Sequence, residues 1–242
     1  MPSIIVILPT WNEAENLPAM VAALLALPLE NLRVLVADDN SPDGTGRLAD
    51  ELARQHPGQV SVLHRRQRKG YGPATLDGFR TALQTDADLI VQMDCDFSHQ
   101  PRYLPALLEK AADADVVIGS RYVQGGSVDE NWGLPRKLLS WWANSVYVRL
   151  LLALPVRDAT GGFRLWRRPA LESLGLAQVT SNGYVFQVEM ICMAHRRGCR
   201  IAEVPIHFPD RVAGSSKMGL PIALEAALSV WQLRRRYRHT RH

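Results

Sequence analysis

Two aspartates, Asp94 and Asp96, stand two residues apart in the stretch VQMDCDFSHQP, directly after an apolar run. Carboxylates at this spacing lie on one side of an extended chain, and at the end of a strand they can converge on one cation. Carboxylate oxygens suit Mg²⁺ or Mn²⁺, which commonly bridge the phosphates of a substrate. The pattern predicts a metal site at Asp94 and Asp96, with Ser98 as a third oxygen and His99 as a surface residue or cap. The alternative is that both acids only cap the helix that follows Pro101.

A second acidic pair, Asp38 and Asp39 in VADDNSPDGT, follows another apolar run. Consecutive strand residues point to opposite faces, so one of these carboxylates can face a nucleotide base or ribose. The letters SPDG that come next are typical of a turn, which is the plainer explanation for Asp43.

Short apolar runs alternate with amphipathic helical patterns along the chain. This alternation predicts an α/β domain in which a mostly parallel sheet is covered by helices on both faces. The expected strands cover residues 3–8, 32–39, 60–64, 88–94, 116–120 and 200–208. The expected helices cover residues 12–27, 45–56, 72–84, 102–112, 135–154 and 184–198, with a last helix near the C-terminus.

Ligands of such a sheet bind outside the carboxyl ends of its strands. Four expected strands end in polar or charged residues, which is more than a purely structural sheet needs. These residues are Pro9 to Glu13, Asp38 to Ser41, Asp94 to Asp96, and Ser120 with Arg121. The sequence therefore predicts a binding site at this edge.

Length and composition narrow the class of protein. The chain has 242 residues, a formal charge of +4 and three cysteines, too few and too irregular for a disulfide framework. We expect no signal peptide and no stretch of roughly 18 apolar residues, and we therefore expect a cytoplasmic protein. The basic tail RRRYRHTRH alone would suit nucleic acid, but the acidic strand ends oppose that role, so we expect no nucleic-acid partner.

A resemblance to a known family is carried by five segments: ILPTWNEAENL, VADDNSPDGT, RKGYGPA, MDCDFSHQP and GSRY. In this order and spacing they resemble an inverting family 2 glycosyltransferase of the GT-A fold, which is Rossmann-like. The later segments NWGLPRKLLSWWAN, DATGGFRLWRR, GYVFQVEM and EVPIHFPDRVAGSSK are similar to polyprenol-phosphate (dolichol-phosphate) mannosyltransferases. The later segments separate this group less cleanly from related glucosyl enzymes.

The resemblance implies a reaction in which GDP-mannose gives mannose to a polyprenyl or dolichyl monophosphate, with Mg²⁺ or Mn²⁺ at the leaving diphosphate. It implies catalytic roles for Asp96, Arg121, Arg211 and Lys217. It implies donor contacts at Pro9, Trp11, Glu13, Ala37, Asp39, Asp94, Cys95, Asp96, Arg121, Glu189, Arg211 and Lys217. Asp94, Asp96 and Ser98 would hold the metal, although Ser98 stands where some members have Gln. Tyr184, Gln187, Asp158 and Thr160 would lie near the sugar.

Binding of the acceptor phosphate requires cationic side chains. Arg136 and Ser140 are four residues apart near the start of an expected helix and so share a face, and Arg121 ends a strand close to the acidic pair. The resemblance assigns these three residues to the phosphate. The plainer alternative is a surface arginine and a serine inside a helix.

A lipid acceptor requires contact with a membrane. We expect residues 1–218 to form the catalytic domain and residues 219–242 an amphipathic basic helix and tail. With LLSWWANSVYVRLLLAL it would dock peripherally on the cytoplasmic face, with or without a membrane-anchored partner protein. The rival functions are glucosyl transfer from UDP-glucose and a non-catalytic nucleotide-sugar-binding subunit.

Overall fold

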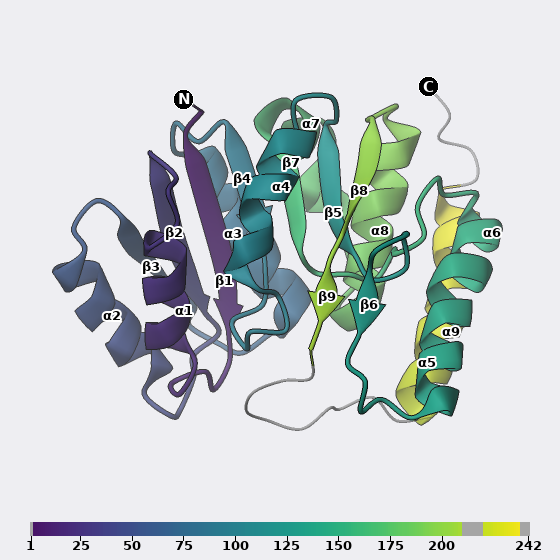
Figure 1. The fold of residues 1–242 in the computed structure, drawn as a ribbon, viewed down its shortest axis with the longest axis horizontal. Coiled ribbons are helices and arrows are strands. Elements are labelled where there is room, and N and C mark those ends of the chain that lie inside the picture. The colour runs from purple at the N-terminus through teal and green to yellow at the C-terminus, as the bar shows by residue number, and fades with distance from the viewer. Residues whose placement is uncertain (1, 210–219, 238–242) are drawn as a thin grey trace.

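A seven-stranded sheet forms the centre of the computed structural model, which describes residues 2–209 and 220–237 without the side chains at positions 184 and 220–227. Its order is β3-β2-β1-β4-β7-β5-β8, and helices cover both faces (Figure 1). Neighbouring strands are parallel except at β7, which is antiparallel to both β4 and β5. The strands are β1 (Ile4–Thr10), β2 (Leu32–Asp38), β3 (Val60–His64), β4 (Leu89–Gln92), β5 (Val116–Ser120), β7 (Arg164–Arg167) and β8 (Ile201–Pro205). Two short strands, β6 (Ser127–Val128) and β9 (His207–Phe208), pair in parallel beside it.

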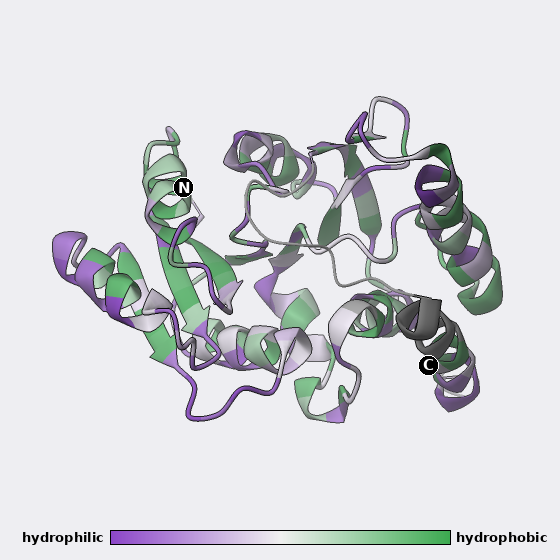
Figure 2. Cartoon of the chain, turned by 90° about the horizontal axis from the view of Figure 1, so that it is seen from below, coloured by the Kyte–Doolittle hydropathy of each residue, from purple (hydrophilic) through white to green (hydrophobic). Residues whose placement is uncertain are grey.

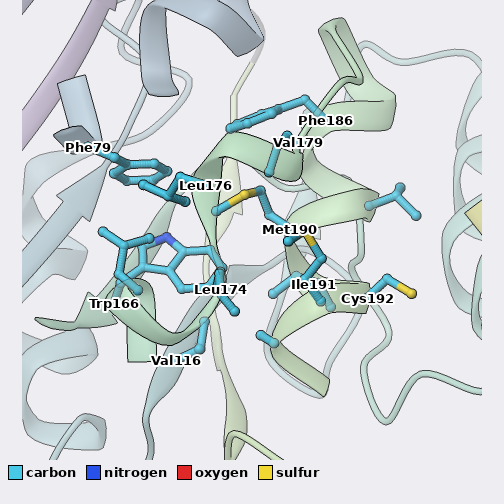
Figure 3. Close-up of a cluster of buried hydrophobic side chains, with 14 of the residues drawn as sticks. Phe79, Val116, Trp166, Leu174, Leu176, Val179, Phe186, Met190, Ile191 and Cys192 are labelled. Carbon is cyan, nitrogen blue, oxygen red and sulfur yellow. The ribbon is translucent and has the colours of Figure 1, made fainter. Parts of the chain in front are cut away.

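Helices from both halves of the chain pack on this sheet because its strands are apolar on both faces. One face is covered by α1 (Leu17–Leu25), α2 (Thr45–Gln55) and α4 (Leu104–Lys110). The other is covered chiefly by α3 (Tyr71–Leu83) and α8 (Gly183–Arg196), with α7 (Arg168–Ser173) beside them. Figure 3 shows the second core, in which Trp166 of β7 lies between Phe79 of α3 and the side chains of α8. The predicted α/β fold with a mostly parallel sheet is confirmed.

In the seven-stranded sheet, the strand β7 was not predicted from the sequence, nor was the short helix α7 that follows it. The segment RLWR of β7 has arginines at both ends, and it lies between Gly162 and the helix α7. Arg164 is nevertheless fully buried, because its guanidinium donates to the carbonyl oxygens of Ala159, Gly161 and Gln187. The pattern of apolar runs could not indicate a strand whose buried arginine is satisfied by backbone from elsewhere.

The expected helix over residues 135–154 is present but is not a uniform α-helix. It consists of α5 (Leu134–Trp141), a π-helical stretch (Trp142–Val148) and α6 (Arg149–Leu152). Figure 2 views the molecule from the edge at which most strands end, with this segment at the right-hand side. Its hydrophobic side chains are partly exposed, as are those of the neighbouring α9 (Leu220–Arg236). The exposed ones are Leu134, Leu138, Leu139, Trp141, Trp142, Leu150, Leu228 and Trp231.

The helix α9 packs on the domain that precedes it. Val230, Leu233 and Tyr237 are buried in the same core as α8. A domain boundary at residue 218 therefore stays a prediction, although the end of α9 is part of the packed structure. No helix within the described ranges is long and apolar enough to cross a membrane.

Candidate active site

An open cavity of about 320 Å³ lies at the carboxyl ends of β1, β2 and β4. The register of the sheet brings these ends together, since Thr10 pairs with Asp38 and the Asp39 amide donates to the Thr10 carbonyl. The lining comes from all the predicted strand ends except that of β5. It consists of Pro9, Thr10, Trp11, Glu13, Asp39, Arg68, Gly70, Tyr71, Ala74, Asp94, Cys95, Asp96, Thr160, Gly162, Gly183 and Gln187.

The two aspartates of the DCD stretch both reach this cavity. The side chain of Asp94 is 29% exposed, and its Oδ1 atom is buried without a hydrogen-bond partner among the described residues. Asp96 is buried, and its Oδ1 accepts from the Ser98 amide at 3.1 Å and from the Ser98 hydroxyl at 2.5 Å. A buried carboxylate oxygen that lacks a donor is costly unless a ligand completes it. The pair therefore fits a divalent cation in its donor chemistry.

His99 is buried rather than exposed, so the expectation of a surface or capping position is wrong. Its Nδ1 accepts the Asp94 amide at 2.8 Å, and its ring stacks on Phe163 with centroids 5.5 Å apart. Burial lowers the pKa of His99, against the charges of Asp94 and Asp96. The ring thus fixes the backbone of the acidic loop, and its Nδ1 is engaged by the Asp94 amide.

Ser98 is held against Asp96 and is absent from the cavity lining. The Ser98 hydroxyl donates its proton to Asp96, and its role as a third metal ligand stays a prediction. Cys95 does line the cavity, and burial followed by the charges of Glu13 and Asp96 raises the pKa of its thiol. Among the described residues, no three His, Cys, Asp or Glu side chains converge as a metal group.

The same cavity is lined by residues expected at the nucleotide. The Arg68 guanidinium lies over the Trp11 ring at 4.1 Å from its centroid, and both line the cavity with Pro9 and Glu13. Asp39 also lines it and is bonded to Arg65 and to the amides of Lys69 and Gly70.

Asp38 and Ala37, which precede Asp39 at the end of β2, do not line the cavity. Asp38 accepts from Ser41 and Thr10, which leaves Asp39 as the acid of this pair that lines the cavity. Ala37 is buried in the core and does not line the cavity, so its contact with the donor stays a prediction.

Three residues with left-handed backbone stand at the edge of this site. Asn12, Asn40 and Phe97 have φ values of 59°, 63° and 61°, each within one residue of a cavity-lining side chain. Asparagine tolerates this conformation, whereas it is unusual for phenylalanine. Backbone of this kind persists only where its surroundings enforce it, which is typical of a site built for a ligand.

Arg121, at the end of β5, is held by Asp158. Its Nε and Nη2 atoms donate to the two Asp158 oxygens at 2.8 and 2.7 Å, and Nη2 also donates to Thr160 at 3.0 Å. Burial acts to raise the pKa of Asp158, but the charge and hydrogen bonds of Arg121 lower it overall. Thr160 lines the cavity, and its amide donates to Asn144 of the π-helical stretch. Through Thr160, the ion pair of Arg121 and Asp158 is thus connected both to the cavity wall and to the exposed helical segment.

The residues expected at an acceptor phosphate lie around Tyr122. Its hydroxyl is 2.5 Å from that of Ser140, and the Arg121 guanidinium lies 5.1 Å from the centroid of its ring. Arg136 is on the same helix as Ser140 and lies over Trp132 at 3.7 Å. The structure therefore brings Arg121 and Ser140 together, with Arg136 one turn away.

Four more residues were expected at the donor or the sugar, and the structure describes the side chain of one of them, Glu189. Glu189 is fully buried away from the cavity, and its oxygens accept from the amides of Thr180 and Ser181, from Arg236 and from Tyr237. This placement runs against a contact between Glu189 and the donor, because its carboxylate is already engaged in holding α9. Arg211 and Lys217 lie outside the described residues, and so does the side chain of Tyr184.

Two polar side chains that line the cavity, Arg68 and Tyr71, were not predicted as site residues. Arg68 lies in the loop after β3, and Tyr71 is the first residue of α3. The signal was present in the two glycines around Tyr71, of which Gly70 has φ of 93° and a Cβ there would lie 2.6 Å from Asn182. Glycines at a close approach after a strand indicate a loop shaped for a ligand.

Comparisons with known proteins agree with this architecture. The model of the family "Glycosyl transferase family 2" matches residues 5–175. An undecaprenyl-phosphate mannosyltransferase from Micrococcus luteus is 46% identical over 237 residues, which cover 97% of this chain and 96% of that protein. A polyprenol monophosphomannose synthase from Mycolicibacterium smegmatis is 45% identical over 236 residues, covering 96% and 88%.

Solved structures share the fold at low sequence identity. Glucosyl-3-phosphoglycerate synthase from Mycobacterium tuberculosis, in complex with Mn²⁺, UDP and glucosyl-3-phosphoglycerate, has a TM-score of 0.64 at 19% identity, covering 96% of this chain and 78% of that chain. Mannosyl-3-phosphoglycerate synthase from Rubrobacter xylanophilus has a TM-score of 0.63 at 16% identity, covering 98% and 74%.

The fold and the acidic site at its strand ends define a glycosyltransferase of the GT-A fold. The chain belongs to glycosyl transferase family 2. The predicted family and enzyme class are thereby confirmed.

Proposed function

We propose that this enzyme transfers mannose from GDP-mannose to the phosphate of a polyprenyl monophosphate, with inversion at the sugar carbon. The observation that carries the proposal is the carboxylate pair Asp94 and Asp96 in the cavity, with one buried oxygen left without a partner. Relatives that are 45% and 46% identical over nearly the whole chain, and whose names state a polyprenol acceptor and mannose, support the substrate assignment.

Asp94 and Asp96 would hold the divalent ion, Mg²⁺ or Mn²⁺, which offsets the charge that gathers on the leaving GDP. Trp11 would stack on the base, and Asp39 would help to fix the loop that meets the nucleotide. Arg211 and Lys217 are proposed to meet the diphosphate from their loop, and Ser98 remains the candidate third ligand.

The acceptor supplies its own nucleophile. A phosphomonoester is largely ionised near neutral pH, with a second pKa of about 6, so its oxygen needs no strong base. The chain's contribution is then to bind and orient the phosphate with Arg121, Arg136 and Ser140. This division of roles agrees with the position of His99, which is buried and whose Nδ1 already accepts the Asp94 amide.

Replacement of Arg136 with alanine tests the acceptor role. We expect the KM for a short polyprenyl phosphate to rise about tenfold and the KM for GDP-mannose to change less than twofold, because one charge-assisted hydrogen bond is lost. Steady-state kinetics with each substrate varied in turn measures both. Lys110→Ala, at the end of α4, is the matched control for loss of a cation. Equal increases in both KM values would contradict the assignment.

Docking on a membrane surface is part of the proposal, because the acceptor is a lipid. The exposed tryptophans and leucines of α5 to α6 and of α9 form one candidate surface, with Arg136, Arg149 and Arg234 exposed beside them. Aromatic rings and arginines are typical of helices that lie in an anionic membrane interface. A peripheral position on the cytoplasmic face, with or without an anchored partner protein, follows from this proposal.

A variant with Leu138→Gln and Trp141→Gln should bind vesicles that contain anionic lipid at least about fivefold more weakly, because it removes apolar area that would enter the interface. Co-sedimentation measures the bound fraction, and an unchanged melting temperature verifies the fold. Deletion of residues 219–242 is the poorer test, since it would remove Val230 and Leu233 from the core. Wild-type binding by the double variant would exclude this face.

The decisive assay incubates the purified chain with Mn²⁺, a short polyprenyl phosphate and either radiolabelled GDP-mannose or UDP-glucose. We expect label in the lipid product from GDP-mannose. Label from UDP-glucose alone would favour the glucosyl alternative. No lipid product from either donor would favour a nucleotide-sugar-binding subunit without catalysis.

A further inference from the structure

A cluster of three neutral polar side chains adjoins Asp94 at the inner end of the cavity. The Tyr71 hydroxyl, at the start of α3, accepts from Gln92 Nε2 at 3.0 Å and from Gln187 Nε2 at 3.2 Å. Gln92 ends β4 and Gln187 lies on α8, so three elements meet at this hydroxyl. A tyrosine hydroxyl carries its proton at neutral pH, so Tyr71 can also donate one hydrogen bond.

This cluster has more acceptors than the described residues satisfy. Gln92 Oε1, Gln187 Oε1 and Asp94 Oδ1 are all buried without a hydrogen-bond partner. The Tyr71 hydroxyl carries one proton, which can serve at most one of them. Exchanging the oxygen and nitrogen of either amide leaves the count unchanged, because an amide donor is then stranded instead. Oxygens this deeply buried need hydrogen-bond donors from a ligand.

The cluster opens to the cavity through Gly162. Tyr71, Asp94, Gln187 and Gly162 all line the cavity. A Cβ at Gly162 would lie 3.1 Å from the Tyr71 hydroxyl oxygen and 3.4 Å from Gln187 Nε2. The glycine thus keeps free the space in front of these polar atoms.

The chemistry of the cluster selects among ligand groups. A phosphate carries negative charge and only accepts hydrogen bonds, so it would face the unpaired Asp94 Oδ1 whichever way the two amides are turned. A second cation would lie near Arg164, which is buried behind the cluster and donates to the Gln187 carbonyl at 2.6 Å. A sugar hydroxyl both donates and accepts, and neighbouring hydroxyls of a hexose offer several such groups at close spacing.

We propose that Tyr71, Gln92 and Gln187 form the subsite that binds hydroxyl groups of the donor hexose, with Gln187 and Tyr71 in direct contact and Gln92 positioning Tyr71. This inference rests on the proposed nucleotide-sugar donor and adds the residues that distinguish one sugar from another. It places the hexose beside Asp94.

The test compares binding of GDP-mannose and of GDP by calorimetry, with Mn²⁺ present. Tyr71→Phe and Gln187→Ala should each weaken GDP-mannose about tenfold and GDP less than twofold, because only the sugar meets these groups. Tyr71→Phe keeps the ring that packs against Phe186. The control is Gln55→Ala on the exposed end of α2, which should change neither ligand.

Donors that each lack one sugar hydroxyl sharpen the result. For the hydroxyl that Gln187 binds, removing both partners should weaken binding by at most about 20-fold, little more than the loss from removing either one, whereas independent losses would multiply to about 100-fold. Equal losses for GDP and GDP-mannose in the two variants, or no loss for either, would overturn the subsite. Full additivity for every missing hydroxyl would also overturn it.

The two proposals can fail separately. If UDP-glucose binds and GDP-mannose does not, the same comparison with UDP and UDP-glucose decides the subsite, and only the donor assignment falls. If neither pair binds, both proposals are overturned.

Discussion

Asp96→Asn should bind Mn²⁺ at least about 100-fold more weakly and lose transferase activity by a similar factor. The carboxylate charge is what a divalent ion requires, and its contribution to offsetting the leaving diphosphate is several kcal/mol. The folded structure should persist, since an asparagine Oδ1 can still accept the amide and hydroxyl of Ser98 that Asp96 binds. Calorimetric titration with Mn²⁺ and the radiolabel assay measure the two losses.

The matched control is Asp113→Asn, which removes a carboxylate from the exposed turn after α4. It should leave Mn²⁺ binding and activity within about twofold, and both variants should melt within about 2 °C of the unmodified protein. Asp94→Asn should resemble Asp96→Asn in metal affinity. If Asp96→Asn bound Mn²⁺ as tightly as the unmodified chain, the metal assignment would be wrong.

The strands and the acidic edge of the sheet could be predicted because both depend on local pattern. Apolar runs such as residues 4–8 and 89–91 are buried on both faces, and this forces the polar and acidic residues that follow them to the strand ends. Asp39 and Asp94 then share a cavity because parallel strands end at one edge. The first helix begins only at Leu17, later than expected, because residues 12–16 form the turn beside the cavity.

The roles of buried polar residues could not be predicted, because their partners are distant in the sequence. Glu189 has the pattern of a helix-surface acid, but it is paired with Arg236 and Tyr237, almost fifty residues later. His99 gains its place from Phe163 and from an amide of its own loop. A single sequence records neither pairing, and burial of a charged or polar group is favourable only once such partners are present.

Arg121→Met should destabilise the fold by about 3–5 kcal/mol, because it leaves the fully buried Asp158 without its cation. For a chain of this size that corresponds to a fall in melting temperature of about 6–20 °C. Transferase activity should also fall, since Thr160 at the cavity wall loses its bond to Arg121. Differential scanning calorimetry and the transferase assay measure the two effects.

A double-mutant cycle with Asp158→Asn separates loss of the pair from loss of packing. The combination of Arg121→Met and Asp158→Asn should be more stable than Arg121→Met alone, because no buried charge remains without a partner. Simple additivity of the two losses would contradict a strongly coupled pair.

The dependence of stability on pH is a second, independent test of the coupling between Arg121 and Asp158. In the unmodified protein Arg121 holds the pKa of Asp158 below its ordinary value of 3.8, so the pair's contribution is complete above that value and is lost only as pH falls further. In Arg121→Met, burial dominates and the pKa of Asp158 rises above the unfolded value. The penalty should then be full at neutral pH and should shrink as the carboxyl is protonated on acidification. Melting temperatures of the variant and the unmodified protein should therefore converge as the pH is lowered from 7, whereas a constant difference would place the cost in lost packing around Arg121.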